Sequence, residues 1–233
     1  MPPRTVILLP PSEAKAPGGT GAPWAPGTMA LPELDGARAE VLRALGGGHP
    51  ASCGPTMPAI ERYTGVLYRE LDAASLPTAA GRRLARSVLT FSGLWGAVAP
   101  RDPIPHYKLK MSAAPVPLGR LATWWRPRLT EALGPRVRGA LVWDLLPIEH
   151  GAAWLPAELR PARRYTVRFV DVDGRTVSHW NKLLKGALVR WLVTTGTADP
   201  RALADFEHPQ GYRFDPGSSD LRRDGGAIVL RRA

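Results

Sequence analysis

Five lysines are the residues of this chain whose type and placement point most directly to chemistry. Arginine supplies almost all of the positive charge, with 26 arginines against five lysines. The lysines fall at three places: Lys15, the pair Lys108 and Lys110, and the pair Lys182 and Lys185. Arginine is permanently charged, whereas lysine is a compact charge whose pKa can be tuned. We therefore expect the lysines to converge on one site that handles an anion, above all phosphate. The alternative is a chance distribution among loops.

The pair Lys182 and Lys185 lies in the first two turns of a helix predicted over 181–195. The N-terminus of a helix carries partial positive charge, so each cation there costs about 0.3–1 kcal/mol. A bound anion would reverse that cost, because amide N–H groups and both ammonium groups would face it. The alternative is that both lysines extend into solvent or pair with Asp171 or Asp173.

A second polar segment follows the buried strand predicted over 5–9. It contains Ser12 and Lys15, and Glu13 between them can act as a base. Ligands of open α/β sheets gather at the carboxyl ends of strands, so we expect Ser12 and Lys15 to contact phosphate. The segment is not a Walker loop, because the Gly-rich spacing and the Gly-Lys-Ser/Thr ending are missing.

The segment 105–111 alternates as a strand does, which would place its three cationic side chains on one face. Tyr107, on the other face, can stack on a base. An edge strand protected by lysines is the alternative. Shortly before it, Gly93 and Gly96 have the Gly-x-x-Gly spacing whose exposed amides can hold a phosphate, as in helix-hairpin-helix elements.

Acid–base groups follow the strand predicted over 140–144. Asp144, Glu149 and His150 can form an acid–base set. A metal site is a weaker interpretation, because Glu149 and His150 are adjacent rather than at ligand spacing. We predict no metal and no cofactor. The five histidines and single cysteine show no ligand spacing, so we rank a heme- or iron-handling protein last.

The net charge is +11 and the pI is near 10.6, and the charged residues are unevenly distributed along the chain. Residues 1–60 hold four basic and four acidic side chains, whereas 61–233 hold 27 basic and 16 acidic ones. This asymmetry indicates an anionic partner, most commonly nucleic acid; a coding bias toward arginine is the alternative. One cysteine suits a reducing cytosol. No stretch approaches the roughly 18 apolar residues of a membrane span, and we expect a cytoplasmic monomer.

Strands and helices are mixed along the chain, which predicts a single α+β domain over 1–233 with a mixed sheet and surrounding helices. The clearest hairpin pattern joins 165–170 to 176–180 at Asp173-Gly174. The other predicted strands are 5–9, 87–91, 140–144, 211–215 and 227–230. Helices are predicted over 35–45, 118–133, 147–155 and 181–195, and over 59–71 with a break at 63–65. A further helix is predicted to begin at residue 78.

Several of these segments, in the same order, resemble the YaaA family of peroxide-stress proteins. The segments that carry the resemblance are 7–15, 62–68, 92–96, the segment with Pro100 and Asp102, 107–111, 181–186 and 206–214. The chain departs from the family at 144–150, where only Leu145 and Glu149 of the family's Asn-Leu-Ala-Ser-Asp-Glu-Tyr block are kept. It also has Asn181-Lys182 in place of Lys-Lys, and Lys185 in place of an arginine.

The resemblance implies a compact domain with a positively charged cleft and a helix-hairpin-helix-like element. It implies DNA binding and a role in limiting damage from hydrogen peroxide and iron, with no established reaction. The residues that it places in the cleft are Lys15, Arg62, Tyr63, Tyr107, Lys108, Lys110, Glu149, Lys182 and Lys185.

Two functions therefore compete. The first is a stress protein that binds DNA mainly through its phosphates in a basic cleft. The second is an enzyme acting on a nucleotide or another small anionic substrate, in which Lys182 or Lys185 holds or activates the substrate and Glu149 or His150 moves protons. A variant of the second is a lyase at damaged DNA, with a lysine forming a Schiff base.

Overall fold

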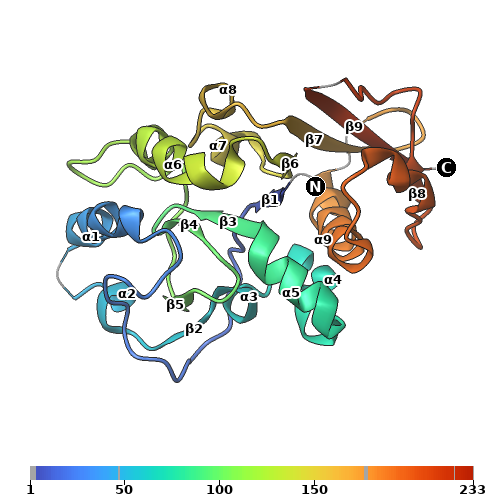
Figure 1. The fold of residues 1–233 in the computed structure, drawn as a ribbon. Helices are drawn as coiled ribbons and strands as arrows, with labels where there is room; N and C mark the ends of the chain where they lie inside the picture. Colours follow the sequence, from blue (N-terminus) through green and yellow to red (C-terminus); the bar gives the residue numbers. More distant parts are fainter. Residues whose placement is uncertain (1–3, 47, 176–177, 223, 233) are drawn as a thin grey trace.

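The computed structural model describes residues 4–46, 48–175, 178–222 and 224–232 and is built around a seven-stranded sheet (Figure 1). The strand order is β4-β3-β1-β6-β7-β9-β8. The five central strands are parallel, and β4 and β8 run antiparallel at the two edges, so the predicted mixed sheet is confirmed. In chain order the strands are β1 (Thr5–Leu9), β3 (Val88–Ser92), β4 (Gly96–Val98), β6 (Leu141–Asp144), β7 (Arg163–Val170), β8 (Tyr212–Phe214) and β9 (Gly225–Arg232).

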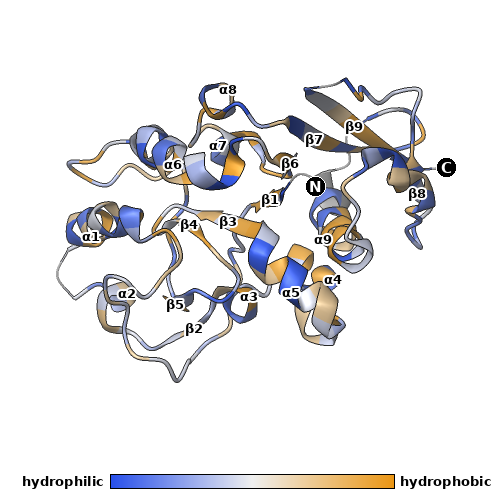
Figure 2. Ribbon diagram, viewed as in Figure 1, coloured by the Kyte–Doolittle hydropathy of each residue, from blue (hydrophilic) through white to orange (hydrophobic). Residues whose placement is uncertain are grey.

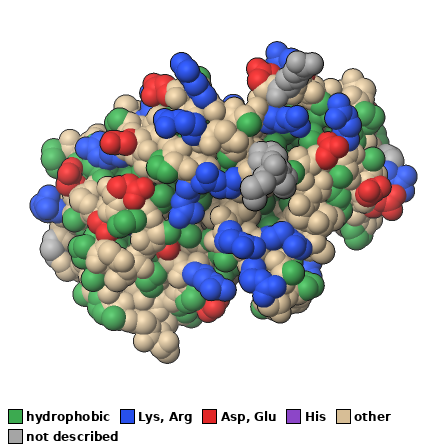
Figure 3. All heavy atoms as spheres, viewed as in Figure 1, with side chains coloured by type: hydrophobic (Ala, Val, Ile, Leu, Met, Phe, Trp, Pro, Cys, Tyr) green, Lys and Arg blue, Asp and Glu red, His purple; other side chains and the backbone are tan. Residues whose placement is uncertain are grey.

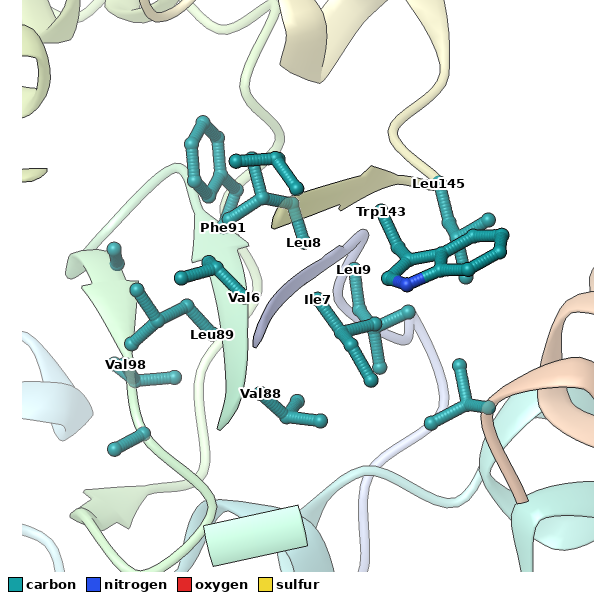
Figure 4. Packing of buried hydrophobic residues seen from close by; sticks show 14 of the residues in the cluster. Val6, Ile7, Leu8, Leu9, Val88, Leu89, Phe91, Val98, Trp143 and Leu145 are labelled. Atoms are coloured by element: carbon teal, nitrogen blue, oxygen red, sulfur yellow. The ribbon is translucent and has the colours of Figure 1, made fainter. Parts of the chain in front are cut away.

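Strand β1 occupies the centre of the sheet because it is apolar on both faces. Its residues 6–9 are at most 3% exposed. Ile7 lies opposite Val88 of β3 and opposite Trp143 of β6. Figure 4 shows the β1 side chains packed between those of β3 and those of β6. A parallel strand covered on both faces needs a continuous run of β-branched and aliphatic residues, which is the pattern that predicted it.

Helices cover both faces of this sheet. In Figure 1, α6, α7 and α8 lie above the sheet and α4, α5 and α9 lie below it. Figure 2 shows the strands as mainly hydrophobic, whereas α5 carries strongly hydrophilic residues on its surface. The helices are α1 (Asp35–Ala44), α2 (Pro50–Cys53), α3 (Ala59–Arg62), α4 (Val66–Leu71), α5 (Thr78–Ser87), α6 (Leu121–Val137), α7 (Ile148–Gly151), α8 (Pro156–Leu159) and α9 (Ser178–Thr195). A two-stranded sheet pairs β2 (Thr56–Pro58) with β5 (Pro103–Pro105), and short 3₁₀ helices span Pro32–Leu34, Ala73–Ser75 and Pro200–Asp205.

The order of the strands creates a switch point at β1. The chain passes from β1 to β3 on one side and later to β6 on the other side. Because these strands and β7 are parallel, their carboxyl ends share one edge of the sheet. In open sheets of this kind, ligands bind where the strand order reverses. The segments that leave this edge are 10–15, 93–95, 145–150 and 171–175.

The predicted hairpin between 165–170 and 176–180 is wrong. Strand β7 pairs in parallel with β6 and with β9, and Ser178 already belongs to α9; residues 176 and 177 lie outside the described residues. Gly174 has φ +78° and its N–H donates to Asp171 O at 3.0 Å, within the connection between β7 and α9. Asp-Gly favours tight turns with positive φ, whichever element follows the turn.

Two other predictions agree with the structure, one fully and one in part. Strands β8 and β9 pair antiparallel, as expected for the last two predicted strands. Residues 106–110 are not a strand, yet their exposure alternates as predicted. Lys108 and Lys110 are exposed, whereas Tyr107 and Met111 are buried.

Candidate functional site

Lysines from three separate segments meet around the exposed carboxylate of Glu13. Lys110 Nζ lies 3.3 Å from Glu13 Oε1. The hydrogen bond and charge of Lys110 lower the pKa of Glu13, and the charges of Lys182 and Lys108 lower it further. The negative charge of Glu13 in turn favours the protonated form of Lys15. We call Lys108, Lys110 and Lys182, which are exposed, the outer lysines.

The fold explains why these segments meet. The segment with Glu13 leaves the carboxyl end of β1, and α9, which carries Lys182, follows the carboxyl end of β7. The segment with the other two outer lysines is tied to α7 by a hydrogen bond of 2.7 Å from Ser112 N to Glu149 Oε1. Helix α7 itself follows the carboxyl end of β6. The lysines thus gather at the edge where the strand order reverses.

Lys15 is partly buried and packed against aromatic rings. Its Nζ donates a hydrogen bond of 2.7 Å to Ser12 O. The same atom lies 4.3 Å from the ring centre of Tyr107 and 5.6 Å from that of Tyr63, distances at which a cation is attracted to the ring. Burial lowers the pKa of Lys15 to about 8, and the charge of Glu13 only partly opposes this shift.

A buried hydroxyl chain holds the Tyr107 ring in place. Ser92 Oγ accepts the N–H groups of Leu94 and Trp95 at 3.2 and 3.1 Å. Since both of its lone pairs are occupied, its own proton goes to Tyr107 Oη, 2.7 Å away. Tyr107 Oη then donates to Tyr63 Oη, also at 2.7 Å. Burial raises the pKa of Tyr107 to about 12 and that of Tyr63 well above its usual value, so both phenols remain neutral.

Lys185 is the most deeply enclosed lysine, at 8% exposed. None of the side chains that the structure describes, which exclude those of residues 176–180, forms a hydrogen bond or ion pair with its ammonium. The carboxylate of Asp144 attracts it, but Asp144 is held by Arg164 at 2.6 Å and by the Leu146 N–H at 3.1 Å. Burial lowers the pKa of Lys185 to about 8. With Lys15, we call it an inner lysine.

His150, on α7, is 9% exposed, and the charge of Lys185 reaches it. Its Nδ1 is enclosed and has no hydrogen-bond partner in the described part of the chain. Burial lowers the pKa of His150, the positive charge of Lys185 lowers it further, and Glu149 opposes both. The imidazole is therefore neutral near pH 7 and can accept a proton.

Arg62 is used differently from the prediction. Its side chain is fully buried. The guanidinium donates hydrogen bonds to four backbone carbonyls from three segments: Ala16 and Gly18, Pro55, and Ile104. It holds the loops beside the site and does not face a ligand, so we leave it out of the proposed site.

The Gly-x-x-Gly turn is buried and does not present its amides to an anion. Gly93 packs against backbone, because a Cβ there would lie 2.7 Å from Lys110 O. Gly96 has φ +71°, and a Cβ there would lie 2.7 Å from the Trp125 ring. The turn joins strands β3 and β4, so no helix-hairpin-helix element lies here. Its role is to let the Lys110 segment approach closely.

The helix-dipole argument for the lysine pair on α9 is also corrected. Helix α9 begins at Ser178, three residues before the predicted start, so Lys182 and Lys185 lie in its second and third turns. The dipole effect fades within the first turn. The signal at Lys185 is its burial, which the sequence does not show. Ser92 was missed in the same way, since a serine at the end of a buried strand has no distinctive spacing.

Two hollows in the surface are lined by other residues than the lysines. One, of about 330 Å³, is at the amino edge of the sheet and is lined by three arginines, Arg4, Arg83 and Arg86. Figure 3 shows Lys and Arg side chains gathered on this face over α5. The other, of about 700 Å³, is lined in part by Tyr63, Tyr68, Arg69, Arg82 and Arg101. Both hollows are lined without any of the five lysines.

The described residues contain neither a membrane-spanning helix nor a cluster of metal ligands. None of the described helices combines the length and apolar character that crossing a bilayer requires. In the same residues, no three His, Cys, Asp or Glu side chains are grouped so that they could hold a metal ion.

A mainly parallel sheet covered by helices on both faces, with lysines gathered at its carboxyl edge, defines an α+β protein with a candidate anion site. The sequence profile of the peroxide stress protein YaaA matches residues 31–218. The chain is 41% identical to a UPF0246 protein of Streptomyces coelicolor, over 90% of this chain and 92% of that protein. It is 35% identical to a UPF0246 protein of Corynebacterium efficiens, over 82% and 85% of the two chains. The chain belongs to the YaaA peroxide-stress family, also called UPF0246.

Proposed function

We propose that this protein binds DNA through the phosphate backbone and limits damage from peroxide and iron. The observation that carries the proposal is the gathering of the three outer lysines and Lys15 around a single carboxylate, Glu13. Four positive charges against one negative charge leave an excess that phosphates can neutralise. Such contacts give affinity with little dependence on base sequence.

Further features support the proposal. The chain as a whole carries a net charge of +11, which favours association with a polyanion. The Lys110 side chain is 70% exposed, and an exposed ion pair such as Lys110 with Glu13 is weak enough to be exchanged for a phosphate. The proposal extends to a positively charged cleft, to one domain over 1–233, and to a monomer in the cytoplasm. Strands β1 and β9 lie outside the family match yet belong to the central sheet, which supports the single domain.

The proposal predicts a salt-dependent affinity that falls when one outer lysine is neutralised. For wild type, the logarithm of the binding constant for a 20-base-pair duplex should fall with the logarithm of salt concentration with a slope of about −3 or steeper. Lys110→Gln should weaken binding and make the slope shallower by about one. Fluorescence anisotropy at three salt concentrations measures both quantities.

Arg86→Gln is the matched control for this measurement. It removes one positive charge from the hollow at the amino edge, on another part of the molecule, and should leave the slope unchanged. Absence of binding at low salt would refute the proposal. If Arg86→Gln weakened DNA binding and Lys110→Gln did not, the DNA would bind at the amino edge of the sheet, and the proposal would also be refuted.

An enzyme acting on a nucleotide or another small anionic substrate is the second candidate. The inner lysines favour it, because partial burial and a pKa near 8 are more than phosphate docking requires. In this function Lys185 would activate the substrate and His150 or Glu149 would move protons. Competition separates the candidates: a mononucleotide at micromolar concentration should displace the duplex only if the second candidate is correct.

A further inference from the structure

The larger of the two hollows, of about 700 Å³, has no part in the proposed function. It is lined by residues of α3, α4 and α5 and of the turn that follows β4 (Figure 1). A volume of this order is typical of pockets that hold small molecules. None of the five lysines lines it, so the positive charge around it comes from arginine alone.

Three arginines from three different elements line this hollow. Arg69 belongs to α4, Arg82 to α5, and Arg101 to the turn after β4. All three side chains are exposed. No carboxylate of the described residues pairs with any of them, and the residues outside the described ranges include no Asp or Glu. Three guanidinium groups are therefore available to an anion.

The carboxylates in the lining do not cancel this charge. They are Glu61 and Asp72. Asp72 lies 3.8 Å from a guanidinium nitrogen of Arg190, which also donates to the Asp72 backbone carbonyl at 2.9 Å. Three guanidinium groups against the one remaining carboxylate leave an excess of two positive charges. A phosphate monoester carries a charge of about −1.5 to −2 at pH 7, which matches this excess.

The turn that carries Arg101 is held by a buried carboxylate. Asp102 is 5% exposed, and its two carboxylate oxygens accept the N–H groups of Ala30 and Ala99, both at 2.8 Å. The Asp102 N–H closes the turn on Ala99 O at 3.1 Å. The backbone of Arg101 is thus fixed before a ligand arrives, which lowers the entropic cost of binding.

The inner part of the lining is apolar. Leu84, Tyr63 and Tyr68 are at most 6% exposed. The two phenol rings lie 5.0 Å apart, and their hydroxyls are bonded within the protein, with Tyr68 Oη donating to Pro10 O at 2.8 Å. Both rings therefore offer carbon rather than hydroxyl to the hollow. A ligand that uses the whole lining combines a phosphate with an apolar ring.

Helix α5 leaves space for such a ligand at Gly81. Thr78, Gly81, Arg82 and Ala85 all line the hollow, at the spacing of one helix face. A Cβ at Gly81 would meet nothing within 4 Å, and the φ of this glycine is not positive. Glycine inside a helix is less stable than alanine, and neither packing nor backbone conformation requires it here. The missing side chain widens the hollow.

We propose that this hollow binds a nucleoside monophosphate, with the phosphate held by Arg69, Arg82 and Arg101 and the base against the apolar lining. Guanidinium groups on three sides of one hollow suit a compact dianion, whereas an acidic peptide needs cations spaced along a groove. The site uses no lysine, and the proposal is independent of DNA binding.

Isothermal titration calorimetry of the full-length protein at low salt tests the proposal with four probes. Adenosine monophosphate should bind with a dissociation constant of about 10–100 μM, as is usual for a ligand of its size. Inorganic phosphate and adenosine should each bind at least about tenfold more weakly, because each engages only one part of the lining. Glucose 6-phosphate should also bind more weakly, because its sugar is polar.

Variants of α5 locate the binding. Gly81→Leu should fill the hollow and lower the affinity for adenosine monophosphate at least about tenfold, and leucine favours the helix, so the fold should be kept. Gly81→Ala adds only a methyl group and is the matched control. Arg82→Gln should lower the affinity about tenfold, whereas Arg43→Gln, on the exposed surface of α1 and outside the lining, should not change it.

Thermal unfolding confirms that each variant is folded, and Arg82→Gln decides alone if Gly81→Leu is not. Inorganic phosphate bound as tightly as adenosine monophosphate would mean an adventitious ion only. Equal affinity for glucose 6-phosphate would overturn the nucleotide as ligand. Undiminished nucleotide binding by folded Gly81→Leu or Arg82→Gln, or a loss caused by Lys110→Gln instead, would overturn the proposed site.

Discussion

Replacing Lys185 by methionine is expected to stabilise the protein by about 3 kcal/mol at pH 7. Burial lowers the pKa of Lys185 from 10.5 to about 8, and each pKa unit corresponds to about 1.4 kcal/mol against the charged form. Methionine is of similar length and uncharged, so it removes this cost. Thermal unfolding should show a rise in Tm of about 6–12 °C for a chain of this size.

The gain should shrink as the pH rises. Because the folded pKa lies below the unfolded one, the unfolded chain binds more protons between pH 8 and 10.5, and the free energy of unfolding of wild type increases across this range. The variant lacks the part of this increase in the free energy of unfolding that comes from Lys185. The part that comes from Lys15 is present in both proteins. The two stability curves should therefore approach each other above pH 8.

Other charges around Lys185 do not confuse this comparison. They are Asp144 with Arg164, His150, Lys182, and the pair of Glu70 and His208 where α4 packs on α9. All of these groups are present in wild type and in the variant alike, so the difference between the two proteins isolates Lys185. Leu184→Met is the control for methionine itself, since Leu184 is a buried neighbour on α9 and the swap should cost less than about 1.5 kcal/mol. A Lys185→Met protein no more stable than wild type at pH 7 would show that the ammonium has a partner.

The opposite result is expected for the other buried cation beside the site. Arg62→Met should destabilise the protein by about 4 kcal/mol. It would remove the donor of four backbone carbonyls, the buried one of Ile104 and the partly buried ones of Ala16, Gly18 and Pro55. Urea unfolding, or loss of soluble protein at 37 °C, measures the effect.

Arg69→Met on the surface of α4 is the matched control. It removes the same charge from an exposed side chain and should change stability by less than about 0.5 kcal/mol. A similar, small effect of Arg62→Met would mean that the carbonyls find water instead, and that Arg62 is free to take part in anion binding as the sequence suggested.

The sequence predicted those elements whose pattern is local. Strands β1 and β6 are short apolar runs, and their observed bounds match the prediction closely. The predicted alternation of exposed and buried side chains over 106–111 was correct although the segment pairs with no strand. Such alternation depends on backbone extension alone. The α9 start was missed because Ser178–Trp180 reads equally as strand or helix.

The site was predicted less completely, for a physical reason. The gathering of the lysines was expected because they are few among many arginines and cluster at three places, and the fold brings Lys15, Lys108, Lys110 and Lys182 around Glu13. What separates the inner lysines from the outer ones is burial, and burial is set by partners distant in the chain. The sequence does not distinguish Arg62 from Lys185, yet the Arg62 guanidinium donates to four carbonyls, whereas the carboxylate that attracts Lys185 is paired with Arg164.

A lysine titration by nuclear magnetic resonance tests the central claim most directly. Protein labelled with ¹³C in lysine only gives five sets of side-chain signals, which the five Lys→Arg variants assign. The signals of Lys15 and Lys185 should titrate with midpoints near 8, and both should shift when duplex DNA is added at low salt. Midpoints near 10.5 for both lysines would contradict the account. So would the addition of DNA without any shift of either signal.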